Sequence, residues 1–96
     1  MAAGPFSIGS ALWPGISKLV EEAGEVSQVC GKLIGSGGEI MHWDGTNLKE
    51  RLEDEIADLL AACFFVAAVC NLDAVKIDAR MKAKLETFSG WHKEQT

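Results

Sequence analysis

Two short acidic motifs carry the residues of this sequence whose types and spacing could do chemistry. Glu21, Glu22 and Glu25 form an EExxE motif, and Glu55 and Asp58 form an ExxD motif further along the chain. An α-helix turns by about 100° per residue, so each motif would project its carboxylates within one arc of a helix. Ionised carboxylates at the border of an apolar face would cost several kcal/mol each unless a cation compensates them. The two motifs together are therefore a candidate cation site.

The donor atoms of this candidate site are all oxygens, because neither motif contains a histidine or a cysteine. Mg²⁺ and Mn²⁺ prefer oxygen donors, whereas Zn²⁺ usually recruits histidine or cysteine. Four carboxylates that meet between two antiparallel helices would therefore suit Mg²⁺, with Mn²⁺ as a substitute. The alternative is a solvated helix face. That alternative suits Glu21 better than Glu55 and Asp58, since the helix around the latter pair is otherwise apolar.

The first acidic motif lies in a segment with helical periodicity. Apolar residues recur at three- and four-residue steps over residues 12–34, which predicts an amphipathic helix. Trp13-Pro14 marks its beginning, since proline is tolerated in the first turn, and GSGG at residues 35–38 marks its end. Residues 35–47 are rich in glycine and contain an Asp-Gly pair, so we expect a loop there.

The second acidic motif lies in a helix predicted over residues 48–70, with Thr46 or Asn47 as its N-cap. The later half of this segment, LLAACFFVAAVC, is apolar on every face, and such a helix is normally buried on all sides. A chain of this size can hardly bury it alone. The sequence therefore predicts a subunit interface over this half of the helix.

A third helix is expected after Asp73, which can serve as its cap, and Ser89-Gly90 is expected to end it. Its apolar stripe consists of Ile77, Met81, Leu85 and Phe88. Nowhere does the sequence alternate as a strand would. We therefore predict an all-α fold in which three main helices form an antiparallel bundle, over a single domain of residues 1–96 and completed by oligomerisation as a homodimer or homotetramer.

Composition narrows the classes of partner. Acidic residues outnumber basic ones by 14 to 9, and the net charge of −5 disfavours a broad electrostatic grip on nucleic acid. The longest apolar run, residues 59–70, is too short to span a bilayer, and no basic segment precedes an apolar stretch at the start. Cys30, Cys63 and Cys70 lie in apolar patterns without CxxC spacing, so we expect reduced core residues. The expectation is a soluble, cytoplasmic protein.

The order of the motifs resembles the signature of the MazG-like all-α nucleoside triphosphate pyrophosphohydrolases, which are related to dimeric dUTPases and dCTP pyrophosphatases. That signature is EExxE followed one helix later by ExxD, with a glycine-containing loop between them and a third helix after them. The resemblance covers about residues 12–92. The segments WPGISKLVEEAGEV, HWDG and KLETFSGWH look like a small bacterial or phage branch of the family. Little sequence precedes Trp13, so we expect no counterpart of the N-terminal helix of longer relatives in it.

The resemblance implies a reaction and a role for each acid. The reaction is hydrolysis of an NTP or dNTP to the monophosphate and pyrophosphate, in the control of a nucleotide pool. By the same resemblance, Glu22, Glu25, Glu55 and Asp58 would bind Mg²⁺, and Glu21 would orient or deprotonate the attacking water. This division agrees with the general chemistry of metal-assisted hydrolysis, in which an adjacent carboxylate accepts a proton.

A triphosphate also needs positive charge and a surface for its base. Arg80 and Lys84 lie four residues apart on the predicted third helix, and Lys18 lies one turn before Glu22, with which it can pair at i, i+4. Trp43 and His42 could form a base pocket, and this aromatic loop favours a purine deoxynucleotide such as dGTP. The alternative for the basic residues is a solvated helix face.

Two rival functions remain from other classes. A ferritin-like di-iron protein also places carboxylates inside a helical bundle, but it needs Glu-x-x-His on two helices, and the match here, Glu39 to His42, falls in the glycine-rich loop. A non-enzymatic helical adaptor or antitoxin-like partner would use the apolar second helix as its interaction surface. It predicts no Mg²⁺ dependence.

Overall fold

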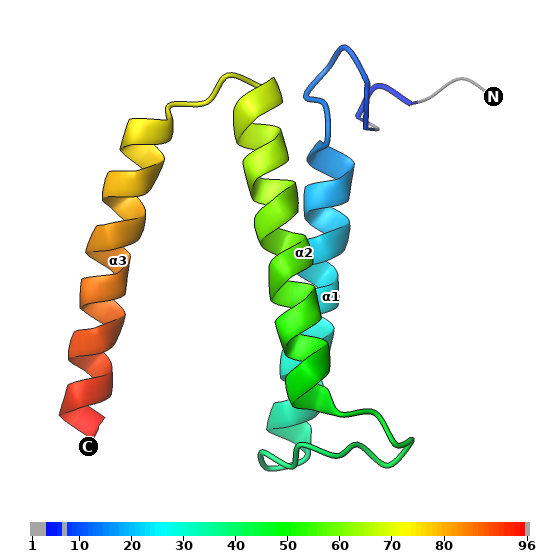
Figure 1. The fold of residues 1–96 in the computed structure, drawn as a ribbon, viewed down its shortest axis with the longest axis vertical. Coiled ribbons are helices and arrows are strands. Elements are labelled where there is room, and N and C mark those ends of the chain that lie inside the picture. Colours follow the sequence, from blue (N-terminus) through cyan, green and yellow to red (C-terminus); the bar gives the residue numbers. More distant parts are fainter. Residues whose placement is uncertain (1–3, 7, 96) are drawn as a thin grey trace.

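The three helices that the apolar patterns predict are present in the computed structural model of the chain, which describes residues 4–6 and 8–95. They are α1 (Ile16–Gly35), α2 (Leu48–Val69) and α3 (Ala74–Gln95), as Figure 1 shows. No strand forms among the described residues, and one isolated bridge joins Met41 to Asn47 across the loop before α2. The all-α class is confirmed.

Glycines define both ends of α1. Gly15 precedes the helix with a φ of 83°, in the left-handed region that favours glycine. A Cβ atom at Gly15 would lie 2.6 Å from the ring of Phe65, so this glycine also allows the start of α1 to approach α2 closely. At the other end, Gly38 donates its backbone N–H to the carbonyl of Leu33 at 2.8 Å. The predicted end of the helix at GSGG is confirmed.

Side-chain caps define where α2 and α3 begin. The Asn47 side chain accepts a hydrogen bond of 3.0 Å from the backbone N–H of Glu50, three residues into α2. The Asp73 side chain accepts one of the same length from the backbone N–H of Lys76 in α3. Both residues satisfy backbone donors that the first helical turn leaves unpaired. Of the two residues expected to cap α2, Asn47 is the cap, and the predicted cap Asp73 is confirmed.

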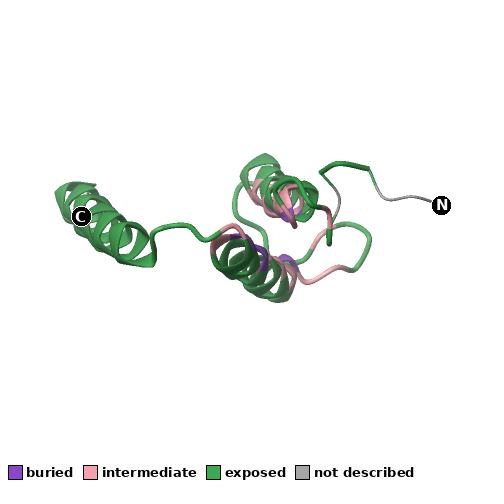
Figure 2. Cartoon of the chain, turned by 90° about the horizontal axis from the view of Figure 1, so that it is seen from above, coloured by how far each residue is buried: buried purple, intermediate pink, exposed green. Residues whose placement is uncertain are grey.

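α1 and α2 run antiparallel, side by side, and share the small core of the chain (Figure 1). Its buried apolar residues are Val29, Leu48, Ala62 and Val66. Figure 2 shows the buried positions gathered where the two helices face each other. Burying a valine or leucine fully contributes about 1.5–3 kcal/mol. These contacts fix the relative position of the two helices, and so of the two acidic motifs.

α3 stands apart from the other two helices (Figures 1 and 2), and none of its described residues is buried. Within one chain, therefore, two helices pack as an antiparallel pair and the third contributes nothing to their core. The predicted stripe of α3, represented by Ile77 and Phe88, is exposed to 46% and 52%. The three-helix bundle and its completion by oligomerisation stay predictions.

The expected end of α3 at Ser89-Gly90 is wrong, because the helix continues to Gln95. A glycine inside a helix costs only about 1 kcal/mol relative to alanine, which is too little to stop a helix by itself. Beyond Gly90 the ring of Trp91 lies 5.5 Å from that of Phe88, centroid to centroid. This contact supports the last turns.

Two other expectations concern the surface of the chain. The three cysteines are free thiols; Cys30 and Cys70 are half-buried, but Cys63 is exposed, so the prediction of a core position is wrong for Cys63 within one chain. In the apolar later half of α2, Ala62 and Val66 are buried, but other large apolar side chains are exposed, such as Phe64 at 72%. None of the helices in the described part of the chain combines the length and apolarity needed to cross a membrane.

Candidate acidic site between the first two helices

Three carboxylates from both motifs converge between α1 and α2. One oxygen each from Glu22, Glu55 and Asp58 can be chosen so that all three lie within 4.8 Å of one another. Glu22 is buried, the side chain of Glu55 is 12% exposed, and Asp58 is open to solvent. We call these three residues the acid triad. The antiparallel pairing of the helices thus brings together three of the four carboxylates predicted as metal ligands.

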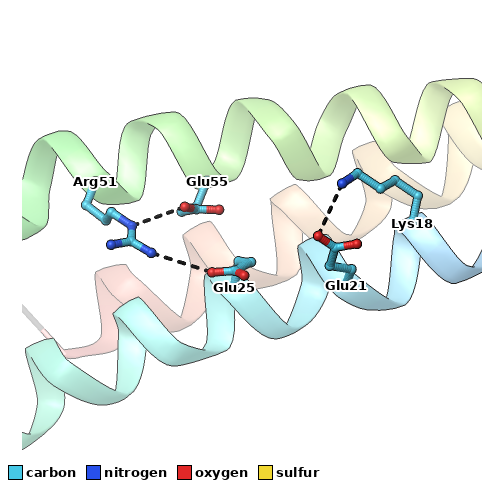
Figure 3. Close-up of polar contacts among 5 residues, drawn as sticks. All are labelled: Lys18, Glu21, Glu25, Arg51 and Glu55. Carbon is cyan, nitrogen blue, oxygen red and sulfur yellow. Dashed lines mark hydrogen bonds and ion pairs between the residues drawn. The ribbon is translucent and has the colours of Figure 1, made fainter.

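The fourth predicted ligand, Glu25, forms an ion pair beside the triad. Its Oε2 atom is 3.5 Å from Nη2 of Arg51, whose Nε atom donates a hydrogen bond of 3.1 Å to Oε1 of Glu55 (Figure 3). Arg51 is a site residue that the sequence reasoning missed. Its spacing of four residues before Glu55 on α2 was the available signal, since residues at i and i+4 are neighbours on a helix.

Lys18 forms ion pairs with the two adjacent acids of the first motif, Glu21 and Glu22. Its ammonium group donates a hydrogen bond of 3.2 Å to Oε1 of Glu21, as Figure 3 shows, and lies 3.3 Å from Oε1 of Glu22. The predicted pairing of Lys18 with Glu22 at i, i+4 is confirmed. Glu21 itself points to solvent, with 58% of its side chain exposed. It lies next to the triad without belonging to it.

Two members of the acid triad, Glu22 and Asp58, line an open hollow of about 350 Å³. Lys18, Glu22 and Asp58 form its polar side. The remaining lining residues are small or apolar, and they are Ile8, Gly15, Ala61, Ala62 and Phe65. Charged groups at the edge of an apolar hollow interact more strongly than they would in water. A polar ligand with an apolar part therefore finds both kinds of surface here.

The other predicted site residues lie away from the triad within one chain. Arg80 and Lys84 share one face of α3, where they line a hollow of about 200 Å³, but α3 stands apart from α1 and α2. His42 and Trp43 lie in the loop before α2, with ring centroids 5.5 Å apart and Trp43 89% exposed. They line a separate hollow with Lys32 and Glu39, near the opposite end of α1 from Lys18.

Comparisons with protein-family models, with curated proteins and with solved structures find no match to this chain. The resemblance to MazG-like enzymes therefore rests on the motifs themselves. The di-iron rival gains no support from the fold, because Glu39 and His42 lie in the loop between Gly35 and Leu48 and not on a helix.

The Lys18 contacts predict how stability responds to alkali. The pKa of Lys18 lies above its usual value of 10.5, first because of its hydrogen bond to Glu21 and then because of its contact with Glu22. A raised folded-state pKa stabilises the fold fully below pH 10.5, and this contribution is lost as the pH rises through the raised pKa. The difference in free energy of unfolding between wild type and Lys18→Met should be constant at neutral pH and shrink in strong alkali. Urea denaturation across pH measures it, and an unchanged difference would contradict the pairing.

Proposed function

We propose that this chain is a Mg²⁺-dependent (d)NTP pyrophosphohydrolase of the MazG-like type, which hydrolyses a nucleoside triphosphate to the monophosphate and pyrophosphate. The observation that carries the proposal is the convergence of Glu22, Glu55 and Asp58 from two motifs and two helices, with Glu22 and Asp58 lining one hollow. Glu22 is buried, and Lys18 at 3.3 Å supplies its compensating charge in the metal-free chain.

The donor chemistry of the acid triad fits Mg²⁺ or Mn²⁺, since all its donors are carboxylate oxygens. Glu22, Glu55 and Asp58 would hold the metal, and Glu25 would be the fourth ligand that the motif implies. When bound, the metal would neutralise phosphate oxygens and lower the pKa of a bound water. The acids alone do not select the metal, so the choice of Mg²⁺ is part of the proposal.

The residues of the chain itself would handle the water and the phosphate. Glu21, exposed beside the triad, would accept a proton from the attacking water. The water oxygen bonds to the α-phosphorus, and the bond from that phosphorus to the bridging oxygen breaks. The bridging oxygen leaves with the electron pair, as part of pyrophosphate. Lys18, half-exposed at the edge of the hollow, can turn its ammonium group towards a phosphate oxygen.

We also propose a homodimer or homotetramer, on the evidence of the apolar surface left open in one chain. Large apolar side chains are exposed on both α2 and α3, and they are Ile56, Leu60, Phe64, Phe65, Val69, Val75, Ile77, Met81, Leu85, Phe88 and Trp91. Exposed apolar surface of this extent is typical of protein interfaces. In such an assembly, Arg80 and Lys84 of α3 would meet the phosphate chain of a substrate.

A nucleotide screen tests the enzyme proposal. All canonical NTPs and dNTPs are incubated with the protein and Mg²⁺, and the products are separated by HPLC. We expect at least one substrate to yield monophosphate and pyrophosphate, and EDTA to abolish the reaction. A purine deoxynucleotide such as dGTP is the first candidate, on the strength of the aromatic surface of Trp43 and His42, although within one chain that surface lies away from the triad. The proposal fails when no nucleotide is hydrolysed above the EDTA background.

A helical adaptor remains a second candidate, and one observation favours it. Lys18 and Arg51 already pair with four of the five motif acids, Glu21, Glu22, Glu25 and Glu55, so the protein itself supplies part of the compensating charge. An adaptor would use the exposed apolar face of α2 and would bind its partner equally well with Mg²⁺ or EDTA. Metal-independent partner binding, together with a negative nucleotide screen, would support it.

A further inference from the structure

Arg51 is the cation that links the two acidic motifs across the helix pair. Its guanidinium group donates a hydrogen bond from Nε to Glu55 on its own helix at 3.1 Å, and its Nη2 atom lies 3.5 Å from Glu25 on α1 (Figure 3). The planar guanidinium can contact two carboxylates at once, which a lysine ammonium does less well. Arg51 thus touches the two motif acids that lie furthest along the site from Lys18.

The two carboxylates bound by Arg51 are also proposed metal ligands. Glu55 belongs to the acid triad and to the Arg51 pair at the same time. Glu25 lies outside the acid triad and forms an ion pair with Arg51. A guanidinium is positively charged at any pH that a folded protein tolerates, so it competes with a metal cation for the same oxygens.

We propose that Arg51 is an internal counter-cation, which a divalent metal displaces from Glu25 and which then contacts the phosphates of the bound nucleotide. This inference rests on the proposed function of the acid triad. In the metal-free protein, Arg51 holds Glu25 and Glu55 and limits the repulsion among the acids. Its side chain is 37% exposed, so the guanidinium can swing outward without uncovering the core. Guanidinium groups bind phosphate through paired hydrogen bonds.

Calorimetric titration with Mg²⁺ alone tests the competition. Removing the competing charge with Arg51→Gln should tighten Mg²⁺ binding about fivefold, since a nearby positive charge repels the metal. Lys49→Gln is the matched control: it removes one positive charge from α2 two residues earlier, at an exposed position with no ion pair to the acids in the described part of the chain. It should leave the affinity within about twofold. A purely structural Arg51 predicts the opposite sign, and weaker Mg²⁺ binding by Arg51→Gln overturns the inference.

Titration of the Mg²⁺-loaded protein with inorganic pyrophosphate tests the proposed contact between Arg51 and the phosphates. Arg51→Gln should weaken pyrophosphate binding about tenfold, the usual size of a lost hydrogen bond to a charged group. Arg51→Lys keeps the charge but not the paired donors, so its affinity should fall between those of wild type and Arg51→Gln. Equal pyrophosphate affinity in wild type and Arg51→Gln overturns the proposed phosphate contact.

An NMR measurement on the wild-type chain applies even when Arg51→Gln does not fold. The sequence has no arginine other than Arg51 and Arg80, so the arginine Nε–H region holds two signals, which Arg80→Lys assigns. Addition of Mg²⁺ should shift the Arg51 signal and leave the Arg80 signal in place. An Arg51 signal that does not move while Mg²⁺ binds overturns the displacement.

The outcomes separate this inference from the proposed function. A wild-type chain that binds no Mg²⁺ overturns both. Nucleotide hydrolysis with an unaltered Arg51 signal overturns the inference alone. Mg²⁺ binding that displaces Arg51, with tighter binding by Arg51→Gln but no hydrolysis of any nucleotide, supports the counter-cation role and overturns the enzyme.

Discussion

Asp58→Asn is expected to lower kcat/KM for the preferred nucleotide by at least about 100-fold, because loss of a metal ligand removes several kcal/mol of charge stabilisation in the transition state. Asp58 is the triad member most open to solvent and lines the hollow, so the amide fits without repacking. Glu22→Gln should cause a loss of similar size. Pyrophosphate release at saturating Mg²⁺ measures both, and calorimetry should show weaker Mg²⁺ binding by each variant.

The same helix offers a matched control. Asp54 lies one turn before Asp58 on α2, is also exposed, and does not belong to the acid triad. Asp54→Asn makes the same isosteric change and the same change of net charge, so we expect activity within about twofold of wild type, as for most surface substitutions. Equal losses in both variants would assign the effect to net charge and contradict a ligand role for Asp58.

Stability separates a ligand role from a structural one. Oxygens of the three triad carboxylates lie within 4.8 Å of one another, and like charges at such a distance repel. Neutralising Asp58 in the absence of metal should therefore raise the free energy of unfolding while activity falls. A variant that loses activity because it unfolds would show the reverse, and urea denaturation of metal-free protein distinguishes the two cases.

Helix boundaries were predictable wherever a local interaction sets them. Asn47 and Asp73 cap their helices through backbone N–H groups three residues away, and GSGG closes α1 within its own last turn. All of these contacts lie inside a few residues, so the sequence alone indicates them. The end of α3 was mispredicted because Gly90 carries only a weak local preference, and the contact between Phe88 and Trp91 supports the helix beyond it.

The acid site was predictable only in part, for a related reason. Period and spacing placed Glu22 at the border of the core, where it is buried, and placed Glu55 and Asp58 together on α2. The contact from Arg51 to Glu25 depends on how α1 and α2 are set against each other. The sequence pattern of a single helix does not determine how that helix is positioned along its neighbour. The position of α3 was unpredictable for the same reason, since no described residue of α3 is buried against the pair.

Leu48→Ala is the substitution with the largest expected effect on stability. Leu48 is 1% exposed, at the start of α2, and its backbone N–H donates a hydrogen bond of 2.7 Å to the Ile40 carbonyl. Truncating a buried leucine costs about 2–5 kcal/mol, through lost apolar burial and the cavity left behind. Small domains are stable by only about 5–15 kcal/mol, so this loss should lower the denaturation midpoint strongly. A loss below about 1 kcal/mol would contradict the burial of Leu48.

Leu60→Ala makes the same chemical change six residues beyond Asp54 on the same helix, at a side chain that is 50% exposed in one chain. Its effect depends on whether another subunit covers α2. Stability that derives from association varies with protein concentration, whereas stability from contacts within one chain does not. Under the proposed assembly, Leu60→Ala should therefore lower the melting temperature by an amount that changes with protein concentration. The loss of stability from Leu48→Ala should persist even in fully dissociated protein, because Leu48 is buried within the chain. Denaturation at several concentrations, with light scattering for the oligomeric state, measures both. A stable monomer in which Leu60→Ala is neutral at every concentration would contradict the assembly and leave the helix pair as the whole folded unit.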